Sequence, residues 1–462
     1  MSLARARAAW FVVVAAIAVG TIGCATAPVA VLAPPERIAF IDINVVDGTG
    51  GMPLPHQDVV VAGDRIESIE PTGGTVNARA IDGRGKTLLP GYIDAHAHIG
   101  TSGVMMSSGQ EGLTTSGNLE RWLLSGVTTI FDMSGPAPEL GDLAARIDDG
   151  AVTAPRLFHT HLVITGPGSH PIPISKELVP MGFLAEHVLP QVDDDDDIDR
   201  VLDVADEELV DFVKIIIDRL PAGTPILDRS LMVRLVKEAR ARHHLVFVHA
   251  GDVDDGVAAA HAGATALAHL PWRGALTAEQ ADELKRTGVV VVTTIAMWES
   301  LTRAAAGRFA ASEADRKLIP AAVLATAEGK TPTDPGSVAI GQELADNVDN
   351  RKATLAALLA AGVPLLVGTD AVLPTVWPGS SYVAELRALV EAGVPVGELI
   401  VAMTSRPARL MAGQNADFGV VQTGKCADLV VVDGDPLQDP AALWRIDTVV
   451  RAGRVVHAAS PR

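Results

Sequence analysis

Cysteine is scarce in this sequence of 462 residues, in which Cys24 and Cys426 are the only two. A fold of this length with so few cysteines is not built on a disulfide scaffold. Basic residues are also in deficit: 37 lysines and arginines stand against 56 aspartates and glutamates, and the formal net charge is −19. Binding to a phosphate backbone requires a basic surface, so this balance excludes nucleic acid as a partner. The aspartates at residues 193–197 add to the negative charge, and we expect them to form a solvated loop.

The N-terminal segment lacks a hydrophobic run long enough to cross a membrane. Its apolar run, at residues 8–19, is shorter than the roughly 20 residues that span a bilayer. Two arginines precede this run, and small residues follow it up to Cys24, which is the arrangement of a signal peptide. We therefore expect residues 1–24 to be a signal peptide and residues 25–37 to be a tether.

Ile22-Gly23-Cys24 is similar to a bacterial lipobox, in which the cysteine becomes the lipidated first residue of the mature protein. Thr21 departs from this pattern, because an aliphatic residue is usual at that position. Cleavage after Ala27 without lipidation is the alternative, although Pro28 disfavours it. The sequence thus predicts an exported protein, periplasmic or at the cell surface, anchored to a bacterial membrane through Cys24.

The long middle of the chain, residues 87–413, alternates apolar strand-like runs with amphipathic helical segments, which predicts a parallel sheet covered by helices. No glycine-rich phosphate turn follows the first of these strands, which argues against an open doubly wound sheet. Eight such units in succession instead predict an α/β fold, a (β/α)8 TIM barrel. Its strands are expected at residues 91–96, 127–132, 156–161, 211–217, 245–249, 265–269, 289–294 and 364–370.

Short strand-like runs separated by glycine and aspartate turns lie on both sides of this region. They occupy residues 38–86 and residues 414–462. Because the two sets have the same character, we expect them to pair into one small β-sandwich domain, with the barrel inserted between its halves.

Polar side chains end several of the predicted barrel strands, and all such ends meet at one face of a barrel. Taken singly, each has another explanation, such as a hydrogen-bonded core histidine or a helix cap. Together, imidazoles and a carboxylate at one face suggest a metal site. The residues are His96, His98, His161, His249, His269 and Asp370. Lys214 lies inside the fourth strand, where an ammonium is costly unless its charge is removed or paired.

At these motifs the chain resembles the amidohydrolase superfamily, and within it the imidazolonepropionase-related and metal-dependent prolidase branch. The resemblance runs from about residue 38 to residue 456. It rests on PGYIDAHAH, VKI, FVHAG, LAHLP, GTDA, TSRPARLMAG and GKCADLVVVDGDP.

The resemblance implies a carbamylated Lys214 that bridges two divalent metal ions, expected to be zinc. His96, His98, Lys214 and Asp370 would hold the more buried metal. The second would be held by His249, His269 and the same lysine. A hydroxide bridging the metals would attack the substrate, and Asp370 would take its proton as the catalytic base.

Several residues near the predicted mouth of the barrel could act on substrate. His161 and His170 are expected to contact it or to stabilise a tetrahedral intermediate, and a plain loop role is the alternative. Arg219 could bind a substrate carboxylate, and Trp377 and Tyr382 could line the pocket or simply pack. The alanine-rich connection at residues 300–350 is expected to be helical and to act partly as a lid.

The expected reaction is hydrolysis of an amide bond in a small molecule: a dipeptide, an N-acyl amino acid or a cyclic amide. Lactone or phosphotriester hydrolysis stays open, because a binuclear centre serves carbonyl and phosphoryl groups alike. A mononuclear deaminase, which would not need Lys214, is a further alternative, and a non-catalytic binding protein is the least favoured. Exposed barrel helices often pair, which leaves a homo-oligomer open.

Overall fold

The computed structural model describes residues 36–99, 113–135, 137–173, 189–208, 210–333 and 335–459. The expected signal peptide, the lipobox and nearly all of the tether lie outside these ranges. The described residues belong to one compact unit that runs from Pro34 onward. None of the helices within them is both long enough and apolar enough to cross a bilayer.

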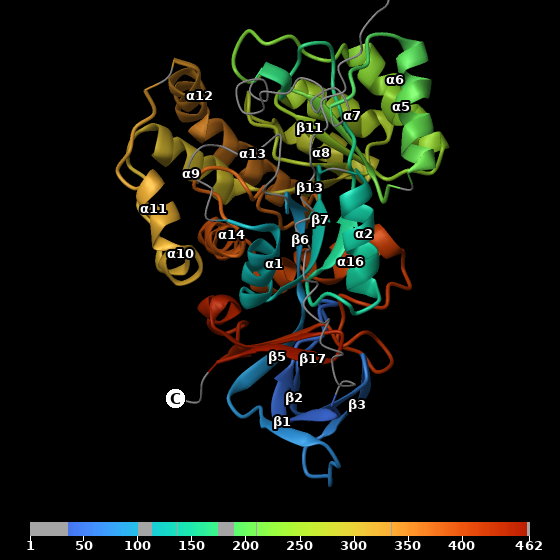
Figure 1. Cartoon of the computed structure of the whole chain (residues 1–462), viewed down its shortest axis with the longest axis vertical. Helices are drawn as coiled ribbons and strands as arrows, with labels where there is room; N and C mark the ends of the chain where they lie inside the picture. Colours follow the sequence, from blue (N-terminus) through green and yellow to red (C-terminus); the bar gives the residue numbers. More distant parts are fainter. Residues whose placement is uncertain are drawn as a thin grey trace, which may run out of the picture. The chain divides into compact units, whose positions relative to one another are not determined.

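An eight-stranded sheet joins the two ends of the chain (Figure 1). In it β15 (Leu429–Asp433) pairs antiparallel with β5 (Lys86–Pro90), which pairs parallel with β1 (Ile38–Val45). The strand order is β17-β16-β15-β5-β1-β2-β3, and β4 also pairs with β1. The other strands are β2 (Leu54–Ala62), β3 (Arg65–Pro71), β4 (Arg79–Asp82), β16 (Ile446–Arg451) and β17 (Arg454–Ala458). Strands from both chain ends therefore share one sheet, while the domain boundaries at residues 86 and 413 stay predictions.

Two parallel sheets make up the central part of the molecule. One has the order β6-β7-β8 and the other the order β14-β13-β12-β11-β10-β9, so strands that follow one another in sequence also lie side by side. Their bounds are β6 (Tyr92–Ala97), β7 (Val127–Asp132), β8 (Arg156–His159), β9 (Val163–Ile164), β10 (Val213–Ile217), β11 (Val246–Ala250), β12 (Ala266–Leu267), β13 (Val290–Val292) and β14 (Leu365–Leu366).

The predicted strand at residues 156–161 is wrong at its end, because β8 ends at His159 and a separate strand, β9, begins at Val163. The hydroxyl of Thr160 accepts a hydrogen bond from the Leu162 backbone amide at 3.2 Å. A local side-chain bond of this kind competes with strand pairing and interrupts the ladder.

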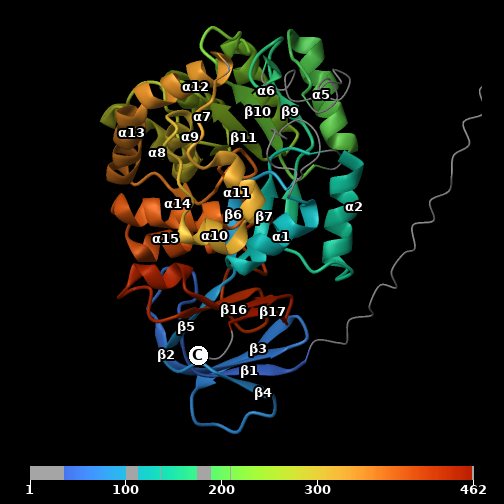
Figure 2. The same ribbon diagram turned by 60° about the vertical axis from the view of Figure 1, so that its left-hand side comes forward.

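Helices connect the parallel strands, and α5, α6, α7 and α8 lie outside the strands β10 and β11 (Figure 2). In α6, Asp228 caps the first turn by accepting from the Ser230 and Leu231 amides. The bounds are α1 (Thr115–Leu124), α2 (Ala137–Asp148), α5 (Asp195–Glu207), α6 (Arg229–Ala241), α7 (Val253–Ala262), α8 (Ala278–Thr287), α9 (Ile295–Ala305), α10 (Glu313–Leu318), α11 (Ala321–Ala327), α12 (Pro335–Asp346), α13 (Val348–Ala361), α14 (Ser380–Glu391), α15 (Val396–Ala402), α16 (Ser405–Ala412) and a 3-10 turn at Pro440–Trp444.

The aspartate run at residues 193–197 starts helix α5 rather than forming the expected loop. Asp194 is the N-cap, and its side chain accepts from the Asp197 amide at 3.0 Å. The next three aspartates occupy the first turn. Carboxylates are favourable there because they face the positive end of the helix dipole.

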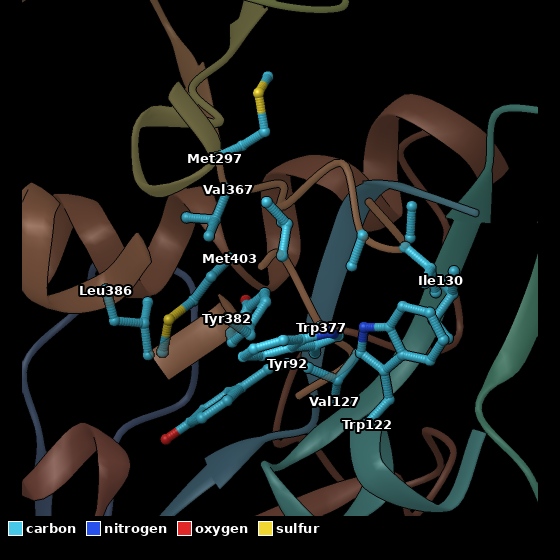
Figure 3. Close-up of a cluster of buried hydrophobic side chains, with 14 of the residues drawn as sticks. Tyr92, Trp122, Val127, Ile130, Met297, Val367, Trp377, Tyr382, Leu386 and Met403 are labelled. Atoms are coloured by element: carbon cyan, nitrogen blue, oxygen red, sulfur yellow. The ribbon is translucent and has the colours of Figure 1, made fainter. Parts of the chain in front are cut away.

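A buried cluster around Tyr92 packs the first residues of β6 and β7 against helix α14 (Figure 3). The rings of Tyr92 and Tyr382 stack with their centroids 6.1 Å apart. The Tyr382 hydroxyl donates to the backbone oxygen of Ile93 at 3.1 Å. Trp377 is also buried in this cluster. Of the two roles open for Tyr382 and Trp377, the structure therefore supports core packing.

Candidate active site

Two histidines and an aspartate bring three metal-ligating side-chain atoms together at the end of the parallel strands. The ligand atoms of His96, His98 and Asp370 all lie within 4.8 Å of one another, and the three residues are buried. The Nε2 atoms of His96 and His98 are 3.2 Å and 2.9 Å from the same Asp370 oxygen. His96 and His98 meet Asp370 in this way because alternate residues of a strand point to the same side.

The backbone holds Asp370 in an unusual conformation. Its φ is +57°, in the left-handed region that non-glycine residues seldom occupy. The Asp370 amide donates to the His96 backbone oxygen at 2.7 Å, and the preceding Thr369 amide donates to the Asp94 carboxylate at 3.0 Å. These bonds fix the direction of the carboxylate relative to the two histidines. Strained residues of this kind are common at functional sites.

A backbone oxygen outside the cluster fixes the ring orientation of His96. Its Nδ1 lies 2.8 Å from the backbone oxygen of Ala268. A carbonyl oxygen only accepts, so Nδ1 carries the proton and Nε2 presents its lone pair toward Asp370. A second partner that fixes the tautomer is typical of metal-ligating histidines.

His269 joins the cluster from the end of β12. Its ring centroid lies 4.4 Å from those of both His96 and His249. The Nδ1 atom is 2.9 Å from the Thr294 hydroxyl, and Nε2 is 3.9 Å from Asp370 Oδ2. His269 therefore also turns Nε2 toward the carboxylate.

His249 presents its other ring nitrogen, because its Nε2 lies 2.8 Å from Oδ2 of the buried Asp218. Arg273 donates to the second Asp218 oxygen and also to Glu343 Oε1, at 2.6 Å for the latter. Burial raises the pKa of Asp218, but the hydrogen bond to His249 and nearby positive charge outweigh it and hold the pKa below its usual value. Asp218 is therefore a carboxylate, and it leaves His249 Nδ1 as the nitrogen for a metal.

Sequence reasoning missed Asp218 and Arg273. Asp218 carried a usable signal, because it directly follows β10, the apolar strand that contains Lys214. Arg273 carried no such signal in the sequence, since its role depends on a carboxylate 55 residues away.

Lys214 lies beside the cluster inside β10. It is 2% exposed, and its Nζ is 3.4 Å from Nε2 of His96. Burial lowers the pKa of this lysine to about 7. A large fraction of the side chain is therefore a neutral amine near neutral pH.

The two histidines expected to act on substrate differ in position. His170 lines the cavity, and its ring lies 5.5 Å from that of His249. Its Nδ1 donates to the Leu220 backbone oxygen at 2.9 Å, so Nε2 is an acceptor. His161 instead faces Glu208, with Nε2 2.7 Å from Oε2, and is not among the described residues that line the cavity. His161 lies beyond the end of β8. Its expected contact with substrate therefore stays a prediction.

Arg219 is also turned away from the cavity. Its guanidinium pairs with Asp252 at 2.8 Å, and 44% of its side chain is exposed. It does not line the cavity, so the structure gives it no path to a substrate carboxylate there.

A cavity of about 360 Å³ opens above the cluster. His96, His98, Lys214, His249, His269 and Asp370 all line it. Helix α9 and helix α12, which lies in the connection expected to act partly as a lid, contribute Met297, Trp298, Leu301, Ala304, Ala305, Ser337, Ile340, Gly341 and Leu344. The arrangement can therefore hold a small molecule against a group of imidazoles and one carboxylate.

Comparison with known proteins gives consistent matches. Residues 87–456 match the model of the amidohydrolase family. The chain is 25% identical over 473 residues to an imidazolonepropionase from Shouchella clausii (strain KSM-K16), covering 90% of this chain and 87% of that protein.

Solved structures with a similar fold include a Xaa-Pro dipeptidase with bound methionine in its active site. It has 21% identity and a TM-score of 0.72, and the match covers 92% of this chain and 100% of that one. Another is the A. niger ochratoxinase, with 18% identity, a TM-score of 0.70 and coverage of 92% and 96%. At these identities the likeness establishes the fold.

Proposed function

This chain belongs to the amidohydrolase family, and from that premise we propose that it hydrolyses an amide bond of a small molecule with bound divalent metal ions. One observation carries the proposal. A single cavity is lined by six residues that lie in, or a few positions beyond, strands far apart in the sequence: His96, His98, Lys214, His249, His269 and Asp370. Imidazole and carboxylate are ligands that zinc prefers.

The proposal includes a closed (β/α)8 barrel formed by the two parallel sheets. Hydrogen bonds between the sheets support it on both sides. The Ala95 amide in β6 donates to the Val367 oxygen after β14 at 2.9 Å, and the Asp211 amide before β10 donates to the His159 oxygen in β8 at 3.1 Å. Closure of this kind brings the carboxyl ends of all strands to one face.

Two metal ions fit the donor set. His96, His98 and Asp370 would hold one, and His249 with His269 would hold the other. Lys214 lies at His96 and would bridge the two as a carbamate, since an ammonium cannot bind a cation. The lowered pKa of Lys214, about 7, supports this modification, because carbon dioxide adds to a neutral amine. Divalent ions supply a lowered pKa for coordinated water and polarisation of the substrate carbonyl.

Asp370 would move the proton. Burial raises its pKa, but the neighbouring His96 and His98 outweigh this and hold the pKa well below its usual value, so the side chain is ionised and can accept a proton. Water adds its oxygen to the carbonyl carbon, and its proton passes to an Asp370 carboxylate oxygen. The carbon–nitrogen bond then breaks, and Asp370 gives the proton to the leaving nitrogen.

His170 would bind the substrate rather than stabilise an oxyanion. Burial lowers its pKa to about 4, so the ring is neutral at pH 7. With Nδ1 bound to Leu220, Nε2 can accept a hydrogen bond, for example from the substrate N–H, but cannot donate one to an oxyanion.

The test is metal stoichiometry by elemental analysis of purified full-length protein, expressed with bicarbonate. About two metals per chain in the parent and markedly fewer in Lys214→Ala would support the proposal. Lys352→Ala, on the exposed side of α13, is the matched control and should bind like the parent. One metal that is unaffected by Lys214→Ala would favour mononuclear chemistry such as deamination. No metal under metal-replete conditions would overturn the proposal.

A further inference from the structure

In the described part of the cavity, the ionisable side chains gather around the candidate metal ligands and His170. Among the described residues that line it, the ionisable side chains are the histidines, Lys214 and Asp370. Apolar residues begin directly beside them, because the ring of Trp298 lies 5.7 Å from that of His269. Much of the apolar lining comes from two groups of residues. Helices α9 and α12 supply one group, and the other consists of Val163, Leu189, Ile216 and Leu220.

The arginines near the cavity are held by other partners. Arg273 binds Asp218 and Glu343, and Arg219 binds Asp252. Arg351 donates to the backbone oxygen of Leu344, at 2.9 Å. No arginine in the described part of the chain lines the cavity. A carboxylate placed against the apolar walls formed by the described residues would lose its hydration without gaining a cationic partner from them, which costs free energy.

We infer that the substrate is a neutral amide with apolar groups on both sides of the scissile bond and no carboxylate beside it. This inference rests on the proposed amide hydrolysis and narrows its substrate class. Among the expected substrates it disfavours dipeptides and N-acyl amino acids and is compatible with an apolar cyclic amide. Transfer of the apolar substrate groups from water to the aliphatic and aromatic side chains of the cavity would make binding more favourable.

The first test compares two compounds that differ by a single carboxylate, N-phenethylhexanamide and N-hexanoyl-L-phenylalanine. We expect kcat/KM of the metal-replete enzyme to be at least about tenfold higher for the neutral amide, since a tenfold ratio corresponds to a difference of only about 1.4 kcal/mol in activation free energy. Equal or faster hydrolysis of the acid would overturn the inference and leave the proposed amide hydrolysis standing.

The second test changes the apolar wall. Ile340→Arg places a cation on the cavity side of α12, whereas Val338→Arg places it two residues away on a side chain that is 49% exposed. We expect Ile340→Arg to lower kcat/KM for the neutral amide more than tenfold and to shift the preference toward the acid. Val338→Arg is the control and should behave like the parent. If Ile340→Arg leaves both values unchanged, α12 does not contact substrate and the inference fails.

Equilibrium binding of the same two compounds, followed by tryptophan fluorescence, separates the inference from the proposed function. Tighter binding of the neutral amide without turnover would support the inference while the proposed hydrolysis fails. Tighter binding of the acid, or no binding of either compound, would overturn the inference.

Discussion

Nε2 of His249 lies 2.8 Å from Oδ2 of Asp218, a fully buried carboxylate that is itself held by Arg273. The pair fixes which nitrogen His249 turns toward the cavity. A carboxylate behind a ligating histidine raises the basicity of the ligand and aligns the ring.

Asp218→Asn should weaken the binding of the second metal. The amide nitrogen of asparagine can donate to Nε2 of His249, which would move the ring proton to Nδ1 and remove the lone pair that faces the cavity. We expect the affinity for zinc to fall about 10–100-fold. Competition with a chromophoric chelator measures it, and Asp203→Asn on the exposed face of α5 is the control. Unchanged affinity would mean that Asp218 does not orient His249.

Gly368→Ala should disturb the site through the backbone. A Cβ at this position would lie 2.5 Å from a methyl carbon of Val292 and 3.0 Å from the Cβ of His96. Both neighbours are buried in packed strands, so His96 would have to move, and we expect a loss of at least about tenfold in metal affinity. Gly397→Ala, where an added Cβ meets nothing within 4 Å, is the control. Equal affinity in the two variants would contradict the expectation.

Glu385 should make the stability of the protein depend on pH. It is fully buried and accepts hydrogen bonds from the Thr293 hydroxyl and from the Ala296 amide, at 2.7 Å for the latter. Burial raises its pKa from 4.5 to about 7. The unfolded chain releases this proton near pH 4.5 while the folded protein keeps it, so stability present at low pH is lost as the pH rises through about 7.

Glu385→Gln, which mimics the protonated side chain, should therefore gain stability relative to the parent as the pH rises from 5 to 8. The shift sets an upper limit of about 3 kcal/mol on the gain. Urea unfolding of both proteins at the two pH values measures it. A difference that does not change with pH would show that Glu385 titrates normally.

Cys24→Ser tests our proposal that the exported protein is lipidated at Cys24, which the pattern of residues 1–24 supports. The variant should leave the membrane fraction, because one serine cannot carry the lipid, while turnover of a soluble substrate stays the same. Fractionation of cells followed by detection of the protein measures the distribution. A variant that stays with the membranes would rule out an anchor at Cys24.

The ligand-type residues could be predicted because each lies in a parallel strand or a few residues beyond its end, and the order of the strands brings these positions together. His96 and His98 needed only the two-residue period of a strand. The same reasoning placed His161 inside a strand, whereas β8 ends at His159, so the role of His161 stays a prediction. Where a side chain turns beyond the last paired residue is a tertiary outcome.

Contacts between residues that meet only in the folded chain could not be predicted from the sequence. Arg219 pairs with Asp252 and does not line the cavity, and Trp377 and Tyr382 are buried in the core. The role of residues 193–197 could have been found, since an aspartate followed by acidic residues is a helix start signal. The apolar lining contributed by α9 and α12 depends on how a long connection folds back, which no local pattern specifies.

The pairing of β15 with β5 joins two segments that are synthesised far apart in time. Gly91, immediately before the strand that carries His96, donates to the backbone oxygen of Asp428 at 2.8 Å. The first histidines of the site emerge early from the ribosome, but the strand that anchors them is made near the end of the chain. A chain that stops before Asp428 would therefore contain the histidines, Lys214 and Asp370 but would lack the backbone oxygen to which Gly91 donates.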